Sequence, residues 1–244
     1  MEFPATTPSP AVLPSAAQDV QVPRSAGMRE SGLENKEGWR LTSSVGLLHL
    51  LHLASPALPV GAYSYSQGLE YAVEAQWVRD ETSALDWIAG LLSHTLAHLD
   101  VPVAARLYHA WQHDDVDAVT RWSQFLLANR EARELQDEDR NMGLSLARLL
   151  NDLGMTDAAA WCKADYACFL TLFTLAAQRW QIALPDALHG YLWSWAENQV
   201  LSAVKLIPLG QTAGQRLLRT LQRIYLPLIC RDARGALSFE HAVG

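Results

Sequence analysis

Three features that would point to common protein classes are missing or scarce in this sequence. Cysteine occurs three times, as Cys162, Cys168 and Cys230, without a CxxC pair, which argues against a disulfide framework or a cysteine-based zinc site. Lysine and arginine number 19 against 26 aspartates and glutamates, and the net charge of -7 argues against nucleic-acid binding. No apolar run approaches the roughly 20 residues of a membrane-spanning helix, so we expect no membrane association.

The missing features also indicate the cellular compartment of the protein and the division of its chain into segments. The start of the chain lacks a basic stretch followed by an apolar one, the pattern of a secretory signal, and unpaired thiols suit a reducing compartment. We therefore expect a cytoplasmic protein. Residues 1–40 are rich in Pro, Ala, Ser and Thr without hydrophobic periodicity, which predicts a disordered arm. We expect one helical domain over residues 41–232 and an atypical tail over residues 233–244.

Alternation with a period of two, the pattern of a strand, is also missing, and apolar residues recur at helical spacing from Leu41 onward. Pro56 and Pro59 interrupt this spacing, Asp80 offers an N-cap, and Pro102 is expected to bend or divide a long helix. The fold class is therefore all-α, a single compact multi-helix domain. The predicted helices span residues 45–53, 66–74, 84–111, 114–128, 131–153, 157–181, 185–207 and 211–229.

Motifs for hydrolytic chemistry are incomplete. A nucleophile elbow needs a glycine two residues before and two residues after its serine, and neither Ser64 nor Ser66 has both. Residues 210–215, GQTAGQ, lack the lysine of a phosphate-binding loop. We therefore expect no catalytic residue, no cofactor and no resident metal.

Two histidine pairs leave a second interpretation open. His94 and His98 stand four residues apart, as do His109 and His113, which is the spacing of two metal ligands on one helix face. Thr95 replaces the glutamate that a zinc protease needs as general base, and no third ligand is evident. A helical metal-binding protein, or a metal-dependent enzyme that uses one of these pairs, is the alternative hypothesis.

One segment alternates charges of opposite sign, from Asn129 to Gly143 (NREARELQDEDRNMG). Arg130 with Glu134, and Arg133 with Asp137, have the spacing of ion pairs along a helix. Most of these residues are interpreted as a solvated helix face.

A second segment carries a polar line through an otherwise apolar helix. Asn198, Ser202 and Lys205 share one helical face, which Tyr191 and Trp195 extend. Such a line indicates either a buried hydrogen-bonded seam or a surface that a partner covers. For Lys205 taken alone, a snorkelling surface lysine is the simpler interpretation.

Three blocks of the sequence resemble the UreF family of urease accessory proteins. They are residues 55–70 (SPALPVGAYSYSQGLE), 132–143 (ARELQDEDRNMG) and 191–215 (YLWSWAENQVLSAVKLIPLGQTAGQ), in the family's order. The similarity extends from about residue 41 to residue 228. The resemblance implies an all-helical, dimeric, non-enzymatic protein that joins UreD (also called UreH) and the GTPase UreG on apo-urease. That assembly drives GTP-dependent delivery of nickel to urease.

The resemblance also indicates which residues contact partners. The loop in residues 55–70 is stiffened by prolines and lacks catalytic groups, so its tyrosines are candidate interface anchors. Lys205, at a helix end before Pro208, is expected to meet a carboxylate of the GTPase. The candidate partner-binding residues are Tyr63, Tyr65, Glu70, Arg133, Glu134, Glu197, Asn198, Lys205 and Gln211.

Two stretches depart from the family's pattern. Ala132 and Gln136 stand where threonine and arginine are usual, which weakens the basic character of the charged run. Residues 230–244 do not match the tail that helps the family hold UreD.

Overall fold

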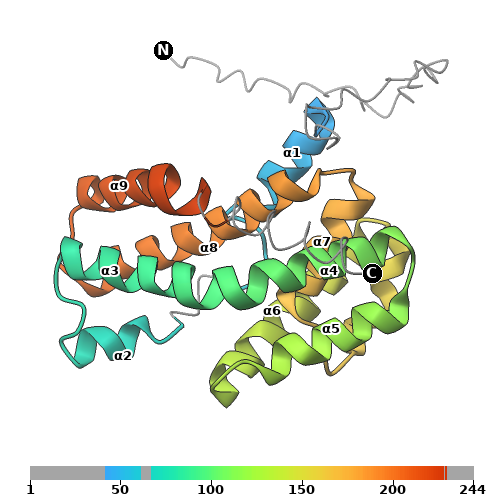
Figure 1. Cartoon of the computed structure of the whole chain (residues 1–244), viewed down its shortest axis with the longest axis horizontal. Helices are drawn as coiled ribbons and strands as arrows, with labels where there is room; N and C mark the ends of the chain where they lie inside the picture. Colours follow the sequence, from blue (N-terminus) through green and yellow to red (C-terminus); the bar gives the residue numbers. More distant parts are fainter. Residues whose placement is uncertain (1–41, 62–66, 228, 230–244) are drawn as a thin grey trace, which may run out of the picture. The chain divides into compact units, whose positions relative to one another are not determined.

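The computed structural model describes residues 42–61, 67–227 and 229, which all belong to one unit of the chain, residues 33–244. Every regular element in these ranges is a helix, which confirms the all-α prediction (Figure 1). The expectations for residues 1–40 and 233–244, and those for Tyr63 and Tyr65, fall outside the described residues.

The first two helices flank the proline-rich loop. Helix α1, Ser44–Leu53, begins at Ser43, whose hydroxyl accepts a hydrogen bond from the Gly46 N–H at 3.1 Å. Helix α2, Leu69–Glu74, begins at Gly68, whose φ of 86° is one that glycine adopts without strain. This turn explains why α2 begins three residues later than the predicted start at residue 66.

The long predicted helix over residues 84–111 is present and continuous (Figure 1). It consists of α3 (Glu81–Leu91), the π-helical η2 (Leu92–Asp100) and α4 (Val101–Gln112). Asp80 and Ser83 form a capping box at its start. The helix continues through Pro102. The π-helical turns of η2 end at Asp100, two residues before this proline, so the change of helix type coincides with it.

This long helix also bears on the expectation that no segment of the chain is apolar enough to span a membrane. By length and apolar content alone, Glu81–Gln112 qualifies as a candidate membrane span. Half of the window that qualifies is buried inside the protein, as in the core helix of a globular fold.

Two further helices meet at the loop that carries Arg130. Helix α5, Val116–Ala128, is capped by Asp115, and helix α6, Arg133–Asp152, follows after an extended Ala132. Gly154, directly after the predicted helix end at residue 153, has a φ of 90° and closes α6.

The prediction of one helix over residues 157–181 is wrong. A 3₁₀ segment, η3 (Thr156–Lys163), is followed by an extended turn, and α7 begins only at Phe169 and ends at Arg179. The turn lies directly against α6, because a Cβ on Gly143 would come within 2.2 Å of the Ala167 carbonyl oxygen. This close contact between the two segments overrides local helix propensity.

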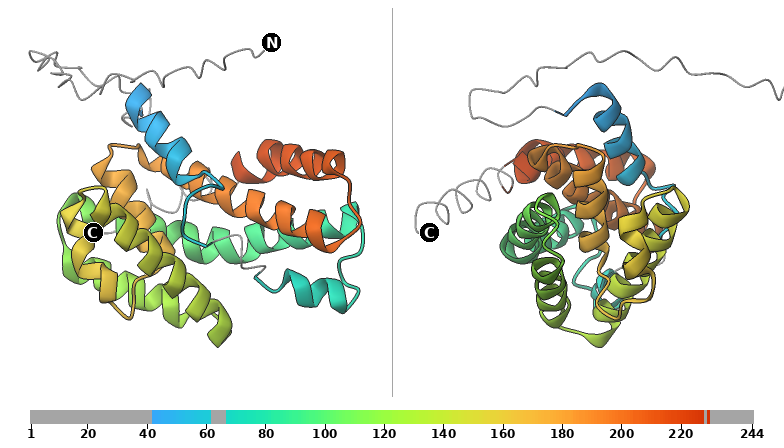
Figure 2. Two further views of the ribbon diagram at one scale, coloured as in Figure 1. Left: turned by 180° about the vertical axis from the view of Figure 1, so that it is seen from behind. Right: turned by 90° about the vertical axis from the view of Figure 1, so that its right-hand side faces the viewer.

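The last elements are α8 (Leu184–Leu206), α9 (Gln211–Thr220) and the π-helical η4 (Leu221–Tyr225). Helix α8 contacts α1, α3, α7 and α9, and Figure 2 shows it running beside α9. Helix α7 packs against α4 and α6, and every residue from Leu170 to Ala177 is buried. One continuous core therefore joins α7 and α8, and the candidate site lies beside these two helices.

Candidate functional site

A pocket of about 190 Å³ lies where the three sequence blocks meet. The first block contributes the proline-rich loop and Gln67, the second contributes the first half of α6, and the third contributes one face of α8. The walls are largely apolar and include Pro56, Leu58, Val60, Leu91, Leu96, Leu135, Met142, Phe169 and Trp195. Segments that are far apart in sequence therefore build one site.

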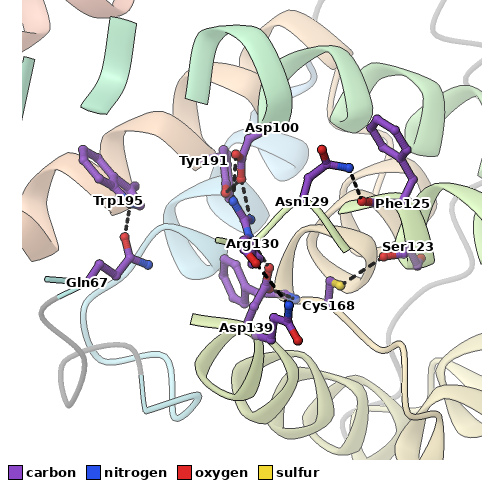
Figure 3. Close-up of polar contacts among 12 residues, drawn as sticks. Gln67, Asp100, Ser123, Phe125, Asn129, Arg130, Asp139, Cys168, Tyr191 and Trp195 are labelled. Carbon is purple, nitrogen blue, oxygen red and sulfur yellow. Dashed lines mark hydrogen bonds and ion pairs between the residues drawn. The ribbon is translucent and has the colours of Figure 1, made fainter. Parts of the chain in front are cut away.

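A buried charged cluster forms part of the pocket wall (Figure 3). The guanidinium of Arg130 donates through Nη1 and Nη2 to Asp100 at 3.0 and 2.7 Å, and through Nε to Asp139 at 2.9 Å. The side chains of Asp100 and Asp139 are 1% and 6% exposed. This bidentate pairing fixes the loop between α5 and α6 against both η2 and α6.

Tyr191 and the start of α7 complete this cluster. The Tyr191 hydroxyl donates to Asp100 at 2.7 Å, and the Phe169 N–H donates to Asp139 at 2.8 Å. Burial, reinforced by the charge of Asp100, raises the pKa of Tyr191 well above its ordinary value, so the hydroxyl keeps its proton. Burial alone would lower the pKa of Arg130, but the charges of Asp100 and Asp139 raise it well above its ordinary value. Both groups therefore hold the ionisation state that the cluster requires.

A thiol lies behind the cluster. Cys168 is fully buried, and its Sγ donates to the Ser123 carbonyl oxygen at 3.5 Å (Figure 3). Burial, followed by the charge of Asp139, raises the pKa of this thiol. The raised pKa and the lack of exposure make Cys168 a structural cysteine rather than a nucleophile.

Part of the polar line on α8, from Tyr191 to Asn198, lies along the pocket, whereas the sequence left open whether this line is a buried seam or a surface that a partner covers. Tyr191, Trp195 and Asn198 all line the pocket, and Asn198 is 8% exposed. The Trp195 indole N–H donates to the side-chain oxygen of Gln67, which fastens the end of the first block to α8 (Figure 3). Lys205 lies outside this seam because its side chain is exposed to solvent.

Glu70 of α2 and Glu134 of α6 both act on the carboxyl group of Glu138. Both are exposed, and both raise the pKa of Glu138, after burial and Asp139, the two larger causes. Glu138 also has a buried carboxylate oxygen with no hydrogen-bond partner among the described residues. An excess of negative charge therefore gathers where the first and second blocks meet.

The remaining candidates lie apart from the pocket. Lys205 stands in the last turn of α8 and Gln211 in the first turn of α9, so both flank the predicted corner at Pro208. Glu197 lies in α8, and burial raises the pKa of its carboxyl. Arg133 is exposed at the start of α6.

The two predicted ion pairs of the charged run have different outcomes. Arg133 pairs with Asp137 at 4.0 Å, which confirms that prediction. The pairing of Arg130 with Glu134 on a solvated face is wrong, because Arg130 precedes α6 and pairs with Asp100 and Asp139 instead.

Neither histidine pair belongs to a metal-binding group within the part of the chain that the structure describes. His94 and His98 are exposed on η2, and His113 donates from Nδ1 to the His109 carbonyl oxygen at 2.8 Å. His109 lies 3.3 Å from the Gln112 side-chain oxygen. Across residues 42–61, 67–227 and 229, no group of three His, Cys, Asp or Glu side chains is arranged to hold a metal ion.

Sequence reasoning missed the Arg130 cluster, although one signal was present. Leu92, Leu96 and Asp100 follow one another at four-residue intervals, so a carboxylate continues an apolar stripe. A buried charge of this kind requires a buried partner. The identity of that partner, Arg130, could not be read from spacing because it lies in a loop 30 residues away.

Comparisons with known proteins give one family. The UreF family model matches residues 78–222. The sequence is 57% identical over 169 residues to the urease accessory protein UreF of Alkalilimnicola ehrlichii, covering 69% of this chain and 74% of that protein. It is 48% identical over 198 residues to UreF of Teredinibacter turnerae, covering 81% of this chain and 89% of that protein. It is also 48% identical over 184 residues to UreF of Pseudomonas putida strain W619, covering 75% and 82% of the two chains.

Proposed function

The chain belongs to the UreF family of urease accessory proteins, and from this premise we propose that it acts in urease maturation as a non-catalytic assembly protein. It joins UreD (UreH) and the GTPase UreG on apo-urease in the cytoplasm. This assembly promotes GTP-dependent insertion of nickel, which is cargo of the complex and not a resident cofactor of this chain.

The convergence of the three blocks on one pocket is the observation that carries this proposal. Three of the four charged side chains that line the pocket are engaged with one another, since Asp100 and Asp139 accept the hydrogen bonds of Arg130. A general acid or base must instead be free to exchange a proton with a substrate. Internally paired charges suit a site that fixes the shape of a docking surface.

Two surfaces outside the pocket suit partner contacts. One carries Glu70, Arg133 and Glu134 around the start of α6. The other is the corner between α8 and α9 that carries Lys205 and Gln211. A lysine at a helix C-terminus is favoured by the helix dipole by roughly 0.3–1 kcal/mol, so Lys205 is held in place to meet a carboxylate of UreG.

Lys205→Ala tests the proposal, with Lys163→Ala, an exposed lysine of η3, as the matched control. Wild-type protein is expected to co-purify with UreD, UreG and apo-urease and to activate urease. Lys205→Ala is expected to keep the wild-type Tm while it lowers activation or its dependence on GTP hydrolysis. Lys205→Arg restores part of the activity because the charge persists but the geometry changes. Wild-type activation by Lys205→Ala, with unchanged UreG binding, would show that Lys205 is an ordinary surface lysine.

We also propose that two copies associate through the outward face of α1. Four apolar residues of this short helix are more than half exposed, namely Val45, Leu47, Leu48 and Leu51. The sequence of α1 contains no charged residue apart from two histidines, whereas the whole chain carries a net charge of -7. Identical copies repel each other wherever charges of one sign face each other, so an uncharged apolar face is where they can approach.

Sedimentation at micromolar concentration tests this self-association. The double variant Leu48→Glu/Leu51→Glu is expected to be monomeric. Leu153→Glu, at a position 56% exposed and remote in sequence from α1, is expected to sediment as wild type does. A wild-type protein that is monomeric both alone and with UreD would contradict the proposal.

A further inference from the structure

Three aromatic rings form a surface over α2, the turn that follows it and α3. Tyr71 and Trp77 are 61% and 60% exposed, and their ring centroids lie 5.5 Å apart at an interplanar angle of 85°. Trp87 lies 6.3 Å from Trp77 and is partly buried. Single exposed apolar residues are common, whereas a contiguous group of large rings marks an interaction site. We call Tyr71, Trp77 and Trp87 the α2 aromatic surface.

The backbone holds Trp77 in place. Helix α2 ends in a Schellman motif, in which the Gln76 N–H donates to Val73 at 3.0 Å and the Trp77 N–H donates to Ala72 at 2.8 Å. Gln76 has a φ of 61°, an unusual value for a residue other than glycine. The motif favours an apolar contact between Trp77 and Tyr71, but smaller apolar side chains at these two positions would also make that contact. It therefore does not account for two large rings that are mostly exposed.

Carboxylates border these rings. Glu70 and Glu74 are exposed and stand four residues apart on α2, and Glu74 is three residues from Tyr71, so all three share one helix face. On α6, Glu134 and Glu138 add negative charge near Glu70, which contributes to the raised pKa of Glu138 after burial and Asp139. A cation over the rings would be attracted both by the ring faces and by these carboxylates.

The chain shows the same chemistry satisfied internally at a second aromatic pair. Trp122 and Phe125 on α5 also meet edge to face, at 5.6 Å and 84°. There the guanidinium of Arg106 lies over the Trp122 ring, 5.0 Å from its centroid. Within the described ranges, no such contact is found for the rings of the α2 aromatic surface.

We propose that the α2 aromatic surface binds arginine side chains of a protein partner, which stack on Trp77 and Tyr71 and pair with Glu70 and Glu74. Arginine fits better than lysine because its planar guanidinium is weakly hydrated, stacks on rings and pairs with carboxylates through two donors. The inference rests on the proposed function, since the partner is a component of the urease maturation assembly. It adds the chemistry of that partner and a new surface. Glu70 is the only one of the earlier candidate residues that it uses.

Binding of the full-length protein to purified UreD, UreG and apo-urease, each measured separately, tests the inference. Trp77→Ala is expected to weaken binding to one of them by about tenfold or more, as for a central aromatic anchor. Glu70→Gln/Glu74→Gln, which leaves the rings intact, is expected to weaken the same binding by about threefold and to make it less sensitive to salt. Phe125→Ala is the matched control, because Phe125 is 47% exposed in the second aromatic pair.

Modification of arginine on that partner with phenylglyoxal should abolish wild-type binding, whereas acetylation of its lysines should have a smaller effect. Wild-type affinity of both variants for all three proteins would overturn the inference and leave the proposed function standing. If Trp77→Ala weakens binding but the wild-type binding is insensitive to salt and phenylglyoxal, the surface takes an apolar partner. If Trp77→Ala instead loses self-association, the surface takes a second copy of the chain. Either result overturns the arginine assignment. If the wild-type protein binds none of the three, the proposed function fails and this inference fails with it.

Discussion

Arg130 and Arg133 stand three residues apart at the junction of α5 and α6, yet their surroundings are opposite. The Arg130 side chain is 16% exposed and contacts Asp100 and Asp139 at hydrogen-bond distance. The Arg133 side chain is 88% exposed, and its pairing with Asp137 is at the distance limit of an ion pair, 4.0 Å. Two arginines of one charged run therefore have different surroundings, one inside the fold and one on its surface.

The difference arises from the backbone between them. Ala132 is extended, with φ -116° and ψ 147°, so Arg130 precedes the helix while Arg133 is its first residue. Gln136 donates from its side chain to the Arg130 carbonyl oxygen at 3.1 Å, which holds this turn closed. Helical spacing rules apply only to residues inside the helix, and a charged run does not reveal which member lies outside it.

Removing the buried arginine should have the largest effect on stability. Arg130→Ala leaves two carboxylates buried without their cation, which costs about 3–5 kcal/mol. For a chain of this size the Tm should fall by roughly 10 °C. Arg130→Lys should recover only part of the loss, because a lysine cannot reproduce the forked contact with Asp100. Thermal unfolding of the three proteins measures the effect, and a loss below about 1 kcal/mol for Arg130→Ala would contradict the importance of the cluster.

Removing one hydroxyl from the same cluster should have an intermediate effect. Tyr191→Phe keeps the ring against Phe169 and Phe173 but removes the donor to Asp100, at a cost of about 1.5–3 kcal/mol for a charged acceptor. Tyr108→Phe is the comparison, since its hydroxyl donates to the neutral carbonyl of Ile182 and should cost about 1 kcal/mol. Denaturant unfolding gives both values, and equal losses would argue that the charge of Asp100 adds nothing to the bond.

Removing the exposed arginine should leave stability almost unchanged. Arg133→Ala is expected to change the free energy of unfolding by less than about 0.5 kcal/mol, because a solvated pair contributes little. If Arg133 contacts a partner, the variant should nevertheless lower urease activation in the reconstituted complex. Arg148→Ala, an exposed arginine of the same helix, is the control and should do neither. A destabilised Arg133→Ala protein would mean that the two arginines differ less than their surroundings suggest.

A small effect of the opposite sign is expected at Glu138. Burial, then Asp139, Glu70 and Glu134, raise the pKa of Glu138, so its ionised form is disfavoured in the folded state. Glu138→Gln should therefore stabilise the protein at pH 7, by less than about 1 kcal/mol after solvent screening. The gain should disappear as the pH falls below the ordinary glutamate value of 4.5, where both states are protonated. Unfolding curves of both proteins at pH 7 and pH 4 check this, and a gain that persists at pH 4 would show a different cause.

The order and type of most helices could be predicted from the sequence because their determinants are local. Asp80 caps a helix as expected, Asp115 caps the helix predicted from residue 114, and Gly154 follows the helix predicted to end at residue 153. The start of α7 could not be predicted, because it depends on the Phe169 N–H meeting Asp139 and on the close approach of Gly143 to the turn. Both contacts join segments that local spacing does not relate.

The same division applies to the candidate site. That Tyr191, Trp195 and Asn198 share one helix face with Ser202 and Lys205 was predicted from helical spacing, although this spacing left open whether the line is a buried seam or a partner surface. The burial of Arg130 was not, because it depends on where a loop turns. Asp100 gave a signal only in hindsight, as a carboxylate on an apolar stripe.

The sealed position of Cys168 offers a way to time the opening of this region. A thiol with no exposure and a raised pKa is protected from alkylating reagents until the surrounding structure opens and its ordinary acidity returns. Its labelling rate with iodoacetamide therefore counts opening events, while the partly exposed Cys162 provides a faster internal reference. Cys168 directly precedes Phe169, whose N–H donates to Asp139 beside the pocket. A partner that makes the pocket more rigid would therefore lower the labelling rate of Cys168.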